Sequence, residues 1–255
     1  TTEIYTLSLH DALPIYRLQT TNEQPAQIQE TYSKLIVQDD ELRDAWSKVQ
    51  QSSAYVDFSK AQKAGKNTNE EKLNQAYLAL LEDPSYQNYS RLNAPHVLSA
   101  AKTSLNQARA KNASANDLAG LQDAVDVAQL DVLRIKAMDS PAYAHFAGAQ
   151  KKLFSLQNKD ETWLKDNPQQ AATAQQELAT AQAKLLEDKE YSQFDAAQAK
   201  QQFKAVQTQV LIAQNQKRPA TEITRLQNQA NLAEKSVQET QQRLEVLETS
   251  EAYKT

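Results

Sequence analysis

The sequence predicts an all-α protein made of tandem helical hairpins, arranged as an elongated antiparallel array or bundle. The chain contains only three glycines in 255 residues, whereas average usage is about 7%. Ala, Gln, Leu and Lys, all good helix formers, dominate the sequence. A short signature also recurs along the chain. So little glycine argues against sheets joined by Gly-rich turns and against Gly loops that cradle phosphate.

The recurring signature has the form [Ser/Asp]-x-x-Tyr-x-x-[Phe/Tyr]. Its full copies span residues 52–58, 83–89, 140–146 and 188–194, and a partial copy begins at residue 250. Flanking positions recur with it: thirteen residues before each Tyr of the full copies stands a leucine, namely Leu42, Leu73, Leu130 or Leu178. Agreement at several registers indicates an internal repeat, which is typical of helical repeat architectures.

The first residue of each signature is predicted to be a helix N-cap. Ser and Asp are favoured there because a side-chain oxygen accepts a hydrogen bond from a free backbone N–H of the first turn. Pro84 and Pro141 follow two of these residues, at the first helical position where proline is tolerated. The predicted N-caps are Ser52, Asp83, Ser140, Asp188 and Ser250. Each signature therefore predicts a sharp junction between two helices without a linker.

The two aromatic residues of each signature are predicted to form a structural seam at the junction. They lie three residues apart, so both rings share one helix face. These predicted core residues are Tyr55, Phe58, Tyr86, Tyr89, Tyr143, Phe146, Tyr191 and Phe194. The alternative is a repeated partner-binding surface, which tandem copies would exploit through multivalency.

Polar loops separate the predicted helices within each repeat. We expect helices near residues 27–51, 53–64, 69–82, 84–111, 116–138, 141–158, 168–187, 189–215 and 221–249. The four polar loops carry turn and cap residues and fall near 63–69, 110–116, 159–168 and 215–221. Trp163 lies in the third loop and is the single candidate for an exposed contact residue.

The signature also divides the chain into segments. Residues 6–15 resemble the translation of a common sequencing adapter, so residues 1–16 are expected to be disordered and to have no part in the fold. The predicted segments are then a partial repeat at 17–54, a short repeat at 55–85, repeats at 86–142, 143–190 and 191–252, and the start of a truncated repeat at 253–255. The chain is therefore expected to be a fragment of a longer gene product.

The sequence offers no pattern expected of an enzyme, a cofactor site or a metal site. There is no Cys, His96 and His145 stand far apart, and a zinc site needs three or four ligands. Neither a nucleophile elbow nor a phosphate-binding loop is present. The net charge of −4 and the interspersed signs argue against nucleic-acid binding. No apolar run approaches the roughly 18 residues of a transmembrane helix.

Two resemblances suggest what the chain does. Residues 190–198 (Glu-Tyr-x-x-Phe-x-x-Ala-Gln) and 222–227 (Glu-Ile-x-x-Leu-Gln), joined through a polar loop, are similar to the YlbF/YmcA-type helical regulators. That resemblance implies a cytoplasmic regulator acting through protein contacts. The whole chain, Cys-free and rich in Ala, Gln, Lys and Asn, resembles the helical repeat stalks of Gram-positive surface proteins, especially those of lactic acid bacteria.

The second resemblance implies a non-enzymatic spacer or adhesive stalk at the bacterial surface, with an unidentified protein or cell-surface partner. This is the function that we expect first, and the cytoplasmic regulator is the alternative. An enzyme ranks third, and a well-formed pocket with convergent polar groups would favour it.

Overall fold

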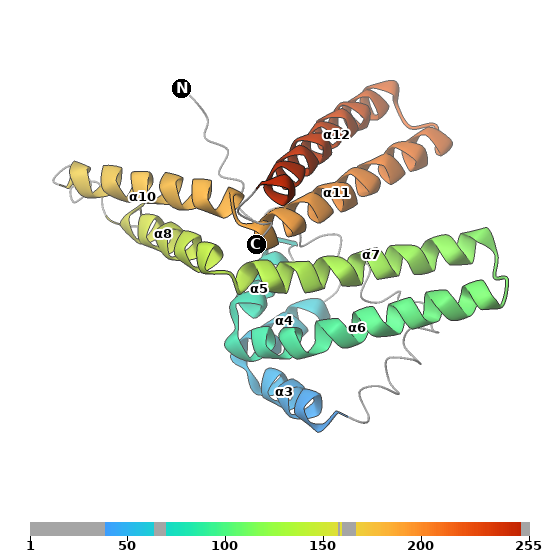
Figure 1. The fold of residues 1–255 in the computed structure, drawn as a ribbon, viewed down its shortest axis with the longest axis horizontal. Coiled ribbons are helices and arrows are strands. Elements are labelled where there is room, and N and C mark those ends of the chain that lie inside the picture. The colour runs from blue at the N-terminus through green and yellow to red at the C-terminus, as the bar shows by residue number, and fades with distance from the viewer. Residues whose placement is uncertain (1–38, 64–69, 158, 160–166, 251–255) are drawn as a thin grey trace. The chain divides into compact units, whose positions relative to one another are not determined.

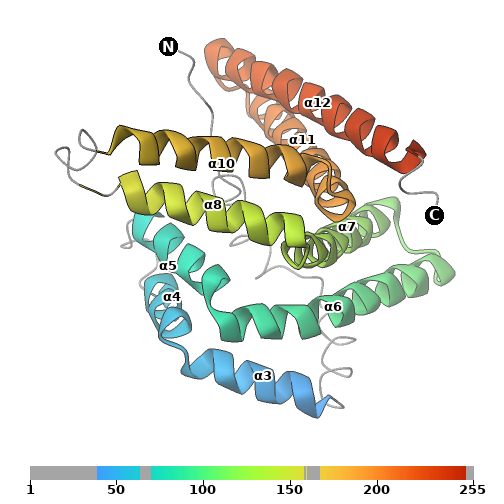
Figure 2. The same ribbon diagram turned by 60° about the vertical axis from the view of Figure 1, so that its left-hand side comes forward.

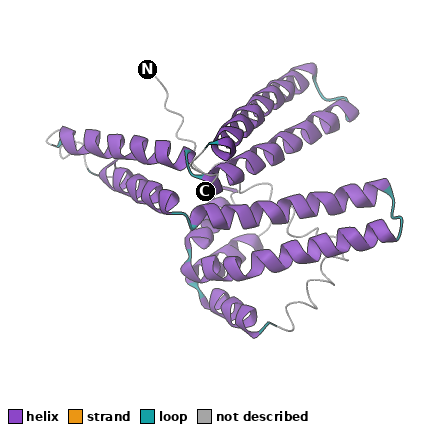
Figure 3. Cartoon of the chain, viewed as in Figure 1, coloured by secondary structure: helices purple, strands orange, loops and turns teal. Residues whose placement is uncertain are grey.

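The computed structural model describes residues 39–63, 70–157, 159 and 167–250. Within these residues the chain forms nine α-helices and no strand (Figure 3), so the predicted all-α class is confirmed. The helices are α3 (Asp40–Gln51), α4 (Ser53–Lys63), α5 (Glu70–Glu82), α6 (Pro84–Ala110), α7 (Ala115–Met138), α8 (Pro141–Gln157), α10 (Pro168–Leu186), α11 (Lys189–Asn215) and α12 (Ala220–Thr249). The chain falls into two compact units, residues 1–129 and 130–255.

The observed helix ends agree with the predicted ones to within one residue, except for the start of the first helix. Helix α3 begins at Asp40 because Asp39 is extended and its side chain accepts a hydrogen bond from the amide of Leu42, at 3.0 Å. The rest of the helix predicted over 27–51 lies outside the described residues, as do the suspected adapter segment and the last three residues. The division into five repeats stays a prediction.

The first unit contains three sets of helix–helix contacts. Helices α4 and α5 pair as a hairpin, and α3 packs against both α6 and α4. Helix α6 pairs with α7 through a core made mostly of alanine, visible as the long green hairpin of Figure 1. The buried members of that core are Ala100, Ala101, Leu105, Ala108, Leu121, Val125 and Ala128. Small side chains of this kind let two helices approach closely.

The second unit contains two further hairpins, α8 with α10 and α11 with α12, and the two helices of each hairpin lie side by side in Figures 1 and 2. The first has a core of Phe146, Ala149, Ala181 and Leu185. In the second, the covered positions alternate in steps of three and four residues, the spacing that keeps one stripe against a partner helix. The covered positions that follow this spacing are 192, 196, 199, 203, 206, 210 and 213 on α11, and 226, 230, 233, 237, 240, 244 and 247 on α12.

The two longest hairpins turn at their tips through the same backbone device. Asn112 follows α6 with φ 51° and Lys217 follows α11 with φ 52°. The next amide in each loop bonds back across the helix end, Ala113 to the carbonyl of Ala108 at 3.0 Å and Arg218 to that of Ala213 at 2.9 Å. This left-handed residue with its six-to-one hydrogen bond is the Schellman ending of a helix.

Candidate functional site

At four helix junctions, one residue opens the new helix with its side chain. Asp83 accepts from the amides of Ser85 and Tyr86 at 2.9 and 3.0 Å, and Asp188 accepts from that of Tyr191 at 2.8 Å. The hydroxyls of Ser52 and Ser140 accept from the amides of Tyr55 and Tyr143, both at 3.2 Å. The backbone of the signature Tyr is thus tied to its cap in every full copy.

The same residue also closes the preceding helix with its backbone N–H. The four amides donate to the carbonyl three residues back: Ser52 to Val49 (3.0 Å), Asp83 to Leu80 (3.1 Å), Ser140 to Ala137 (3.2 Å) and Asp188 to Leu185 (3.1 Å). All four accepting residues are buried. One residue therefore satisfies the end of one helix and the start of the next.

In the first unit the signature aromatics meet each other. The Trp46 ring of α3 lies 5.3 Å from the ring of Tyr55 and 4.9 Å from that of Tyr89, measured between centroids. The ring of Phe58 lies 5.7 Å from that of Tyr77. These distances fall in the range of favourable aromatic pairs. Two successive junctions are therefore joined by one aromatic cluster.

In the second unit, three signature aromatics belong to or pack against the core of the α8/α10 hairpin. Tyr143 and Tyr191 both contact the core of the α8/α10 hairpin, to which Phe146 itself belongs. The ring of Phe194 lies 6.3 Å from that of Tyr191 and is only 1% exposed. The junction between α10 and α11 is thus built on the hairpin before it.

The eight predicted core residues differ in burial. Phe146 and Phe194 are buried, while the others are half-buried: Tyr55, Phe58, Tyr86, Tyr89, Tyr143 and Tyr191. Each signature tyrosine is therefore partly accessible, so the predicted core role and the alternative binding role share these positions.

An ion pair joins the start of α11 to the end of α12, and the sequence reasoning missed it. The guanidinium of Arg243 donates to Asp195 Oδ2, and both side chains are about three-quarters covered. Burial raises the pKa of Asp195 above its usual 3.8, and Arg243 opposes that rise. Burial also raises the pKa of the Tyr191 phenol, helped by the charge of Asp195. Nothing in the spacing of charges in the sequence singles out this pair.

A buried cation occupies a repeat position that is aromatic in the first two copies of the signature. Trp46 and Tyr77 stand nine residues before their signature tyrosines, and Arg134 stands nine before Tyr143. Arg134 is 8% exposed, its Nε lies 3.7 Å from Asp131, and one Nη donates to Met138 Sδ at 3.4 Å. A position-by-position comparison of the repeats in the sequence would have pointed to Arg134.

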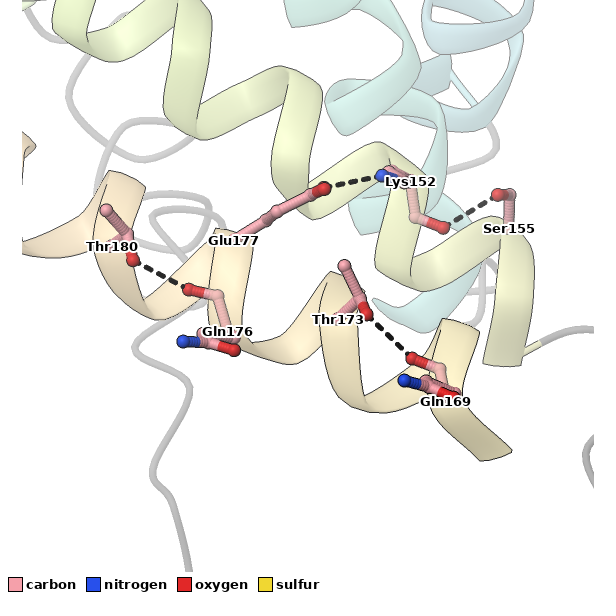
Figure 4. A network of polar contacts seen from close by, with 7 residues as sticks. All are labelled: Lys152, Ser155, Gln169, Thr173, Gln176, Glu177 and Thr180. Atoms are coloured by element: carbon pink, nitrogen blue, oxygen red, sulfur yellow. Dashed lines mark hydrogen bonds and ion pairs between the residues drawn. The ribbon is translucent and has the colours of Figure 1, made fainter. Parts of the chain in front are cut away.

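Several polar contacts lie along the α8/α10 hairpin (Figure 4). Lys152 Nζ lies 2.6 Å from Glu177 Oε2, the one contact drawn there that links the two helices. The hydroxyls of Ser155, Thr173 and Thr180 donate to carbonyls of their own helices. Exposed pairs of this kind contribute little to stability, so the Lys152–Glu177 pair adds little to the stability of the hairpin.

Two other predicted features fall wholly or partly outside the described residues. Trp163 and the truncated fifth signature lie outside the described residues, so the cap expected at Ser250 has no described helix after it. The Ser250 hydroxyl instead donates to the carbonyl of Leu247 at 2.9 Å. His96 Nε2 lies 3.0 Å from Asp39 Oδ2, and His145 is exposed.

Two features are absent from the described part of the chain. No cluster of three or more His, Asp or Glu there is placed to hold a metal ion. None of the helices described combines the length and apolar character that crossing a membrane requires. Comparison with models of known families, with curated proteins and with solved structures finds no match to this chain.

Proposed function

We propose that the chain is a non-enzymatic spacer or scaffold, in which tandem helical hairpins set the distance to, and the presentation of, protein-binding surfaces. One observation carries the proposal: the same single-residue junction occurs four times in the described residues, with the same side-chain cap and the same backbone closure. A linker without such bonds would let the hairpins swing, whereas a spacer needs joints that hold their angle.

The hairpins themselves support this role. Their stripes of covered residues are narrow, and in α11 and α12 they follow the three-and-four spacing of coiled coils. Such hairpins give length with few residues in a core, which suits an array whose repeats contact mainly their neighbours. The accessible tyrosine edges at the junctions would supply contacts repeated along the array.

The setting that we propose first is the surface of a Gram-positive cell, where adhesion would use the repeated contacts. The alternative is a cytoplasmic regulator, supported by the YlbF-like pattern whose Tyr191 and Phe194 lie at the α10–α11 junction. Cell fractionation with an antibody against this chain separates the two: wall-associated protein supports the stalk and purely cytoplasmic protein supports the regulator.

Small-angle X-ray scattering tests the spacer. A globular chain of 255 residues has a radius of gyration of roughly 18 Å, and we expect a value well above it. A compact value would contradict the proposal.

Spin labels test the joint. Labels at the exposed Gln175 of α10 and Gln207 of α11 flank the junction at Asp188, and a narrow distance distribution is expected. Asp188→Ala, which removes the cap, should broaden it. An equally narrow distribution in the variant would show that the cap does not hold the joint.

A further inference from the structure

One face of the α11/α12 hairpin has corresponding positions at its two ends. On α11, Gln209 and Ile212 stand eighteen residues after Tyr191 and Phe194, which is five full turns of an α-helix. On α12, Arg225 stands eighteen residues before Arg243. Because the helices are antiparallel, Ile212 and Arg225 at the tip correspond to Phe194 and Arg243 at the junction end.

At the junction end this arrangement is complete. Phe194 is covered, and the guanidinium of Arg243 contacts the carboxylate of Asp195. At the tip the corresponding positions lack the covered ring and the carboxylate. Ile212 is 43% exposed, and Ala213 stands where the pattern would place the carboxylate.

The cation at the tip has no counter-ion in the described chain. Among the described residues, nothing forms a hydrogen bond or ion pair with Arg225, whereas its neighbour Arg218 donates to Glu222 at 2.8 Å and to Gln216 at 2.9 Å. Arg218 and Glu222 largely neutralise each other, so Arg225 leaves a net positive charge beside the apolar side chain of Ile212.

These side chains line a groove. Its volume is about 360 Å³, and its lining residues are Gln209, Ile212, Arg218, Glu222, Arg225 and Leu226. Leu226 is buried and belongs to the covered stripe of α12. The groove thus offers an apolar surface next to an unneutralised guanidinium, within the size range of sites that hold a few side chains.

We propose that this groove docks an acidic segment of a partner protein, which places a carboxylate on Arg225 and a neighbouring apolar side chain on Ile212. The partner would supply at the tip what Asp195 supplies within the chain at the junction end. Charge complementarity selects this occupant, because guanidinium and carboxylate form paired, charge-assisted hydrogen bonds. The proposal names the partner class of the proposed scaffold and so rests on that function.

The test is a titration of the full chain, labelled with ¹⁵N, with a short capped helical peptide that carries Glu and Leu four residues apart. The arginine Nε–H signal that disappears in Arg225→Gln identifies Arg225. We expect this signal to shift with the Glu peptide and to stay in place with a twin peptide that has Gln instead of Glu. Arg225→Gln should weaken binding roughly 10-fold, the value of one charge-assisted hydrogen bond.

Two further variants sharpen the test. Gln209→Glu adds a carboxylate to the groove lining and should weaken binding by a similar factor, because it neutralises Arg225 from within. Lys235→Gln removes an exposed charge of the same helix that pairs with Glu239, and it should leave binding unchanged.

Three results would overturn the proposal. Equal binding of the two peptides would show that the carboxylate is not read, and peptide binding without a shift at Arg225 would place the site elsewhere. Dimerisation of the free chain that Arg225→Gln abolishes would make a second copy the occupant. Each of these results leaves the scattering and spin-label measurements untouched, so failure of the groove and failure of the spacer are separately visible.

Discussion

The two ends of the α11/α12 hairpin differ far more in burial than in sequence character. At the junction end, Ser192, Phe194 and Gln198 are all buried although two of them are polar. Near the tip, Leu211 and Ile212 are exposed although both are strongly apolar. Burial of these positions therefore follows their contacts with neighbouring helices and not their side-chain type.

This difference means that stability is concentrated at the joints. Tyr191, at the start of α11, also packs against the core of the α8/α10 hairpin, whereas Leu211 and Ile212 near the end of α11 are exposed. Regions with few buried contacts open most easily. The tip is therefore free to carry a binding surface, since changes there cost the fold little.

The largest expected effect is that of Phe194→Ala. The ring is fully covered, so its removal should lower the free energy of unfolding by about 3 kcal/mol or more. Ile212→Ala, its counterpart at the tip, should cost well under about 1 kcal/mol because the side chain is half exposed. Urea unfolding followed by circular dichroism measures both. Equal losses would contradict the contrast between the two ends.

A smaller effect is expected from removing a junction cap. Asp188→Ala deletes the acceptor for the Tyr191 amide and should cost about 1 kcal/mol. Asn167 precedes α10 but makes no side-chain cap hydrogen bond, so Asn167→Ala serves as the matched control and should cost only a few tenths. If the two variants unfolded at the same urea concentration, the cap bond would contribute nothing.

Relieving the backbone at the tip should stabilise the chain slightly. Lys217 adopts φ 52°, a conformation that suits glycine and is unfavourable for a long side chain. Lys217→Gly should therefore raise the free energy of unfolding by about 0.5 kcal/mol. Asn112→Gly at the other long hairpin should raise it by less, because Asn tolerates this conformation better. A loss of stability in Lys217→Gly would contradict this account.

The smallest effect is seen only as a dependence on pH. Because the pKa of Asp195 is raised in the folded chain, the folded state binds the proton more tightly than the unfolded state. This group's contribution to stability is therefore largest at low pH and falls as pH rises from about 3.8 through the raised value. Asp195→Asn removes that dependence.

The measurement compares the native chain with Asp195→Asn in urea unfolding over a series of pH values. The variant should gain stability relative to the native chain as the pH rises through that window. A difference that stayed constant with pH would show that the ion pair with Arg243 cancels the effect of burial on the Asp195 pKa, and a trend of the opposite sign would show that the ion pair outweighs burial.

Local rules in the sequence sufficed to predict the helices. Ser or Asp followed by Tyr three residues later marks each junction, and polar segments with Asn, Pro or Thr mark each tip, so helix ends from 53 to 249 could be placed closely. These signals work because caps and turns are satisfied by residues near in sequence. The start of α3 was missed because Asp39 lies within a continuous helical pattern.

What could not be predicted depends on contacts between distant residues. Asp195 and Arg243 are far apart in sequence and sit among many other charges, so only the register of α11 against α12 identifies them. The exposure of Ile212 and the lack of a described ion pair at Arg225 likewise depend on which side chains the folded hairpin brings together. Those facts belong to packing, which local periodicity does not specify.

The joint made by a single residue has a consequence for how such a chain changes over generations. The side-chain cap and the backbone closure of each junction lie within three residues of the cap residue, while the helices that begin at these junctions range from 11 residues in α4 to 27 in α6 and α11. Whole turns can therefore be inserted into or deleted from an arm without disturbing the corner. Related chains could therefore differ in the lengths of their helices and still keep the same junction between them.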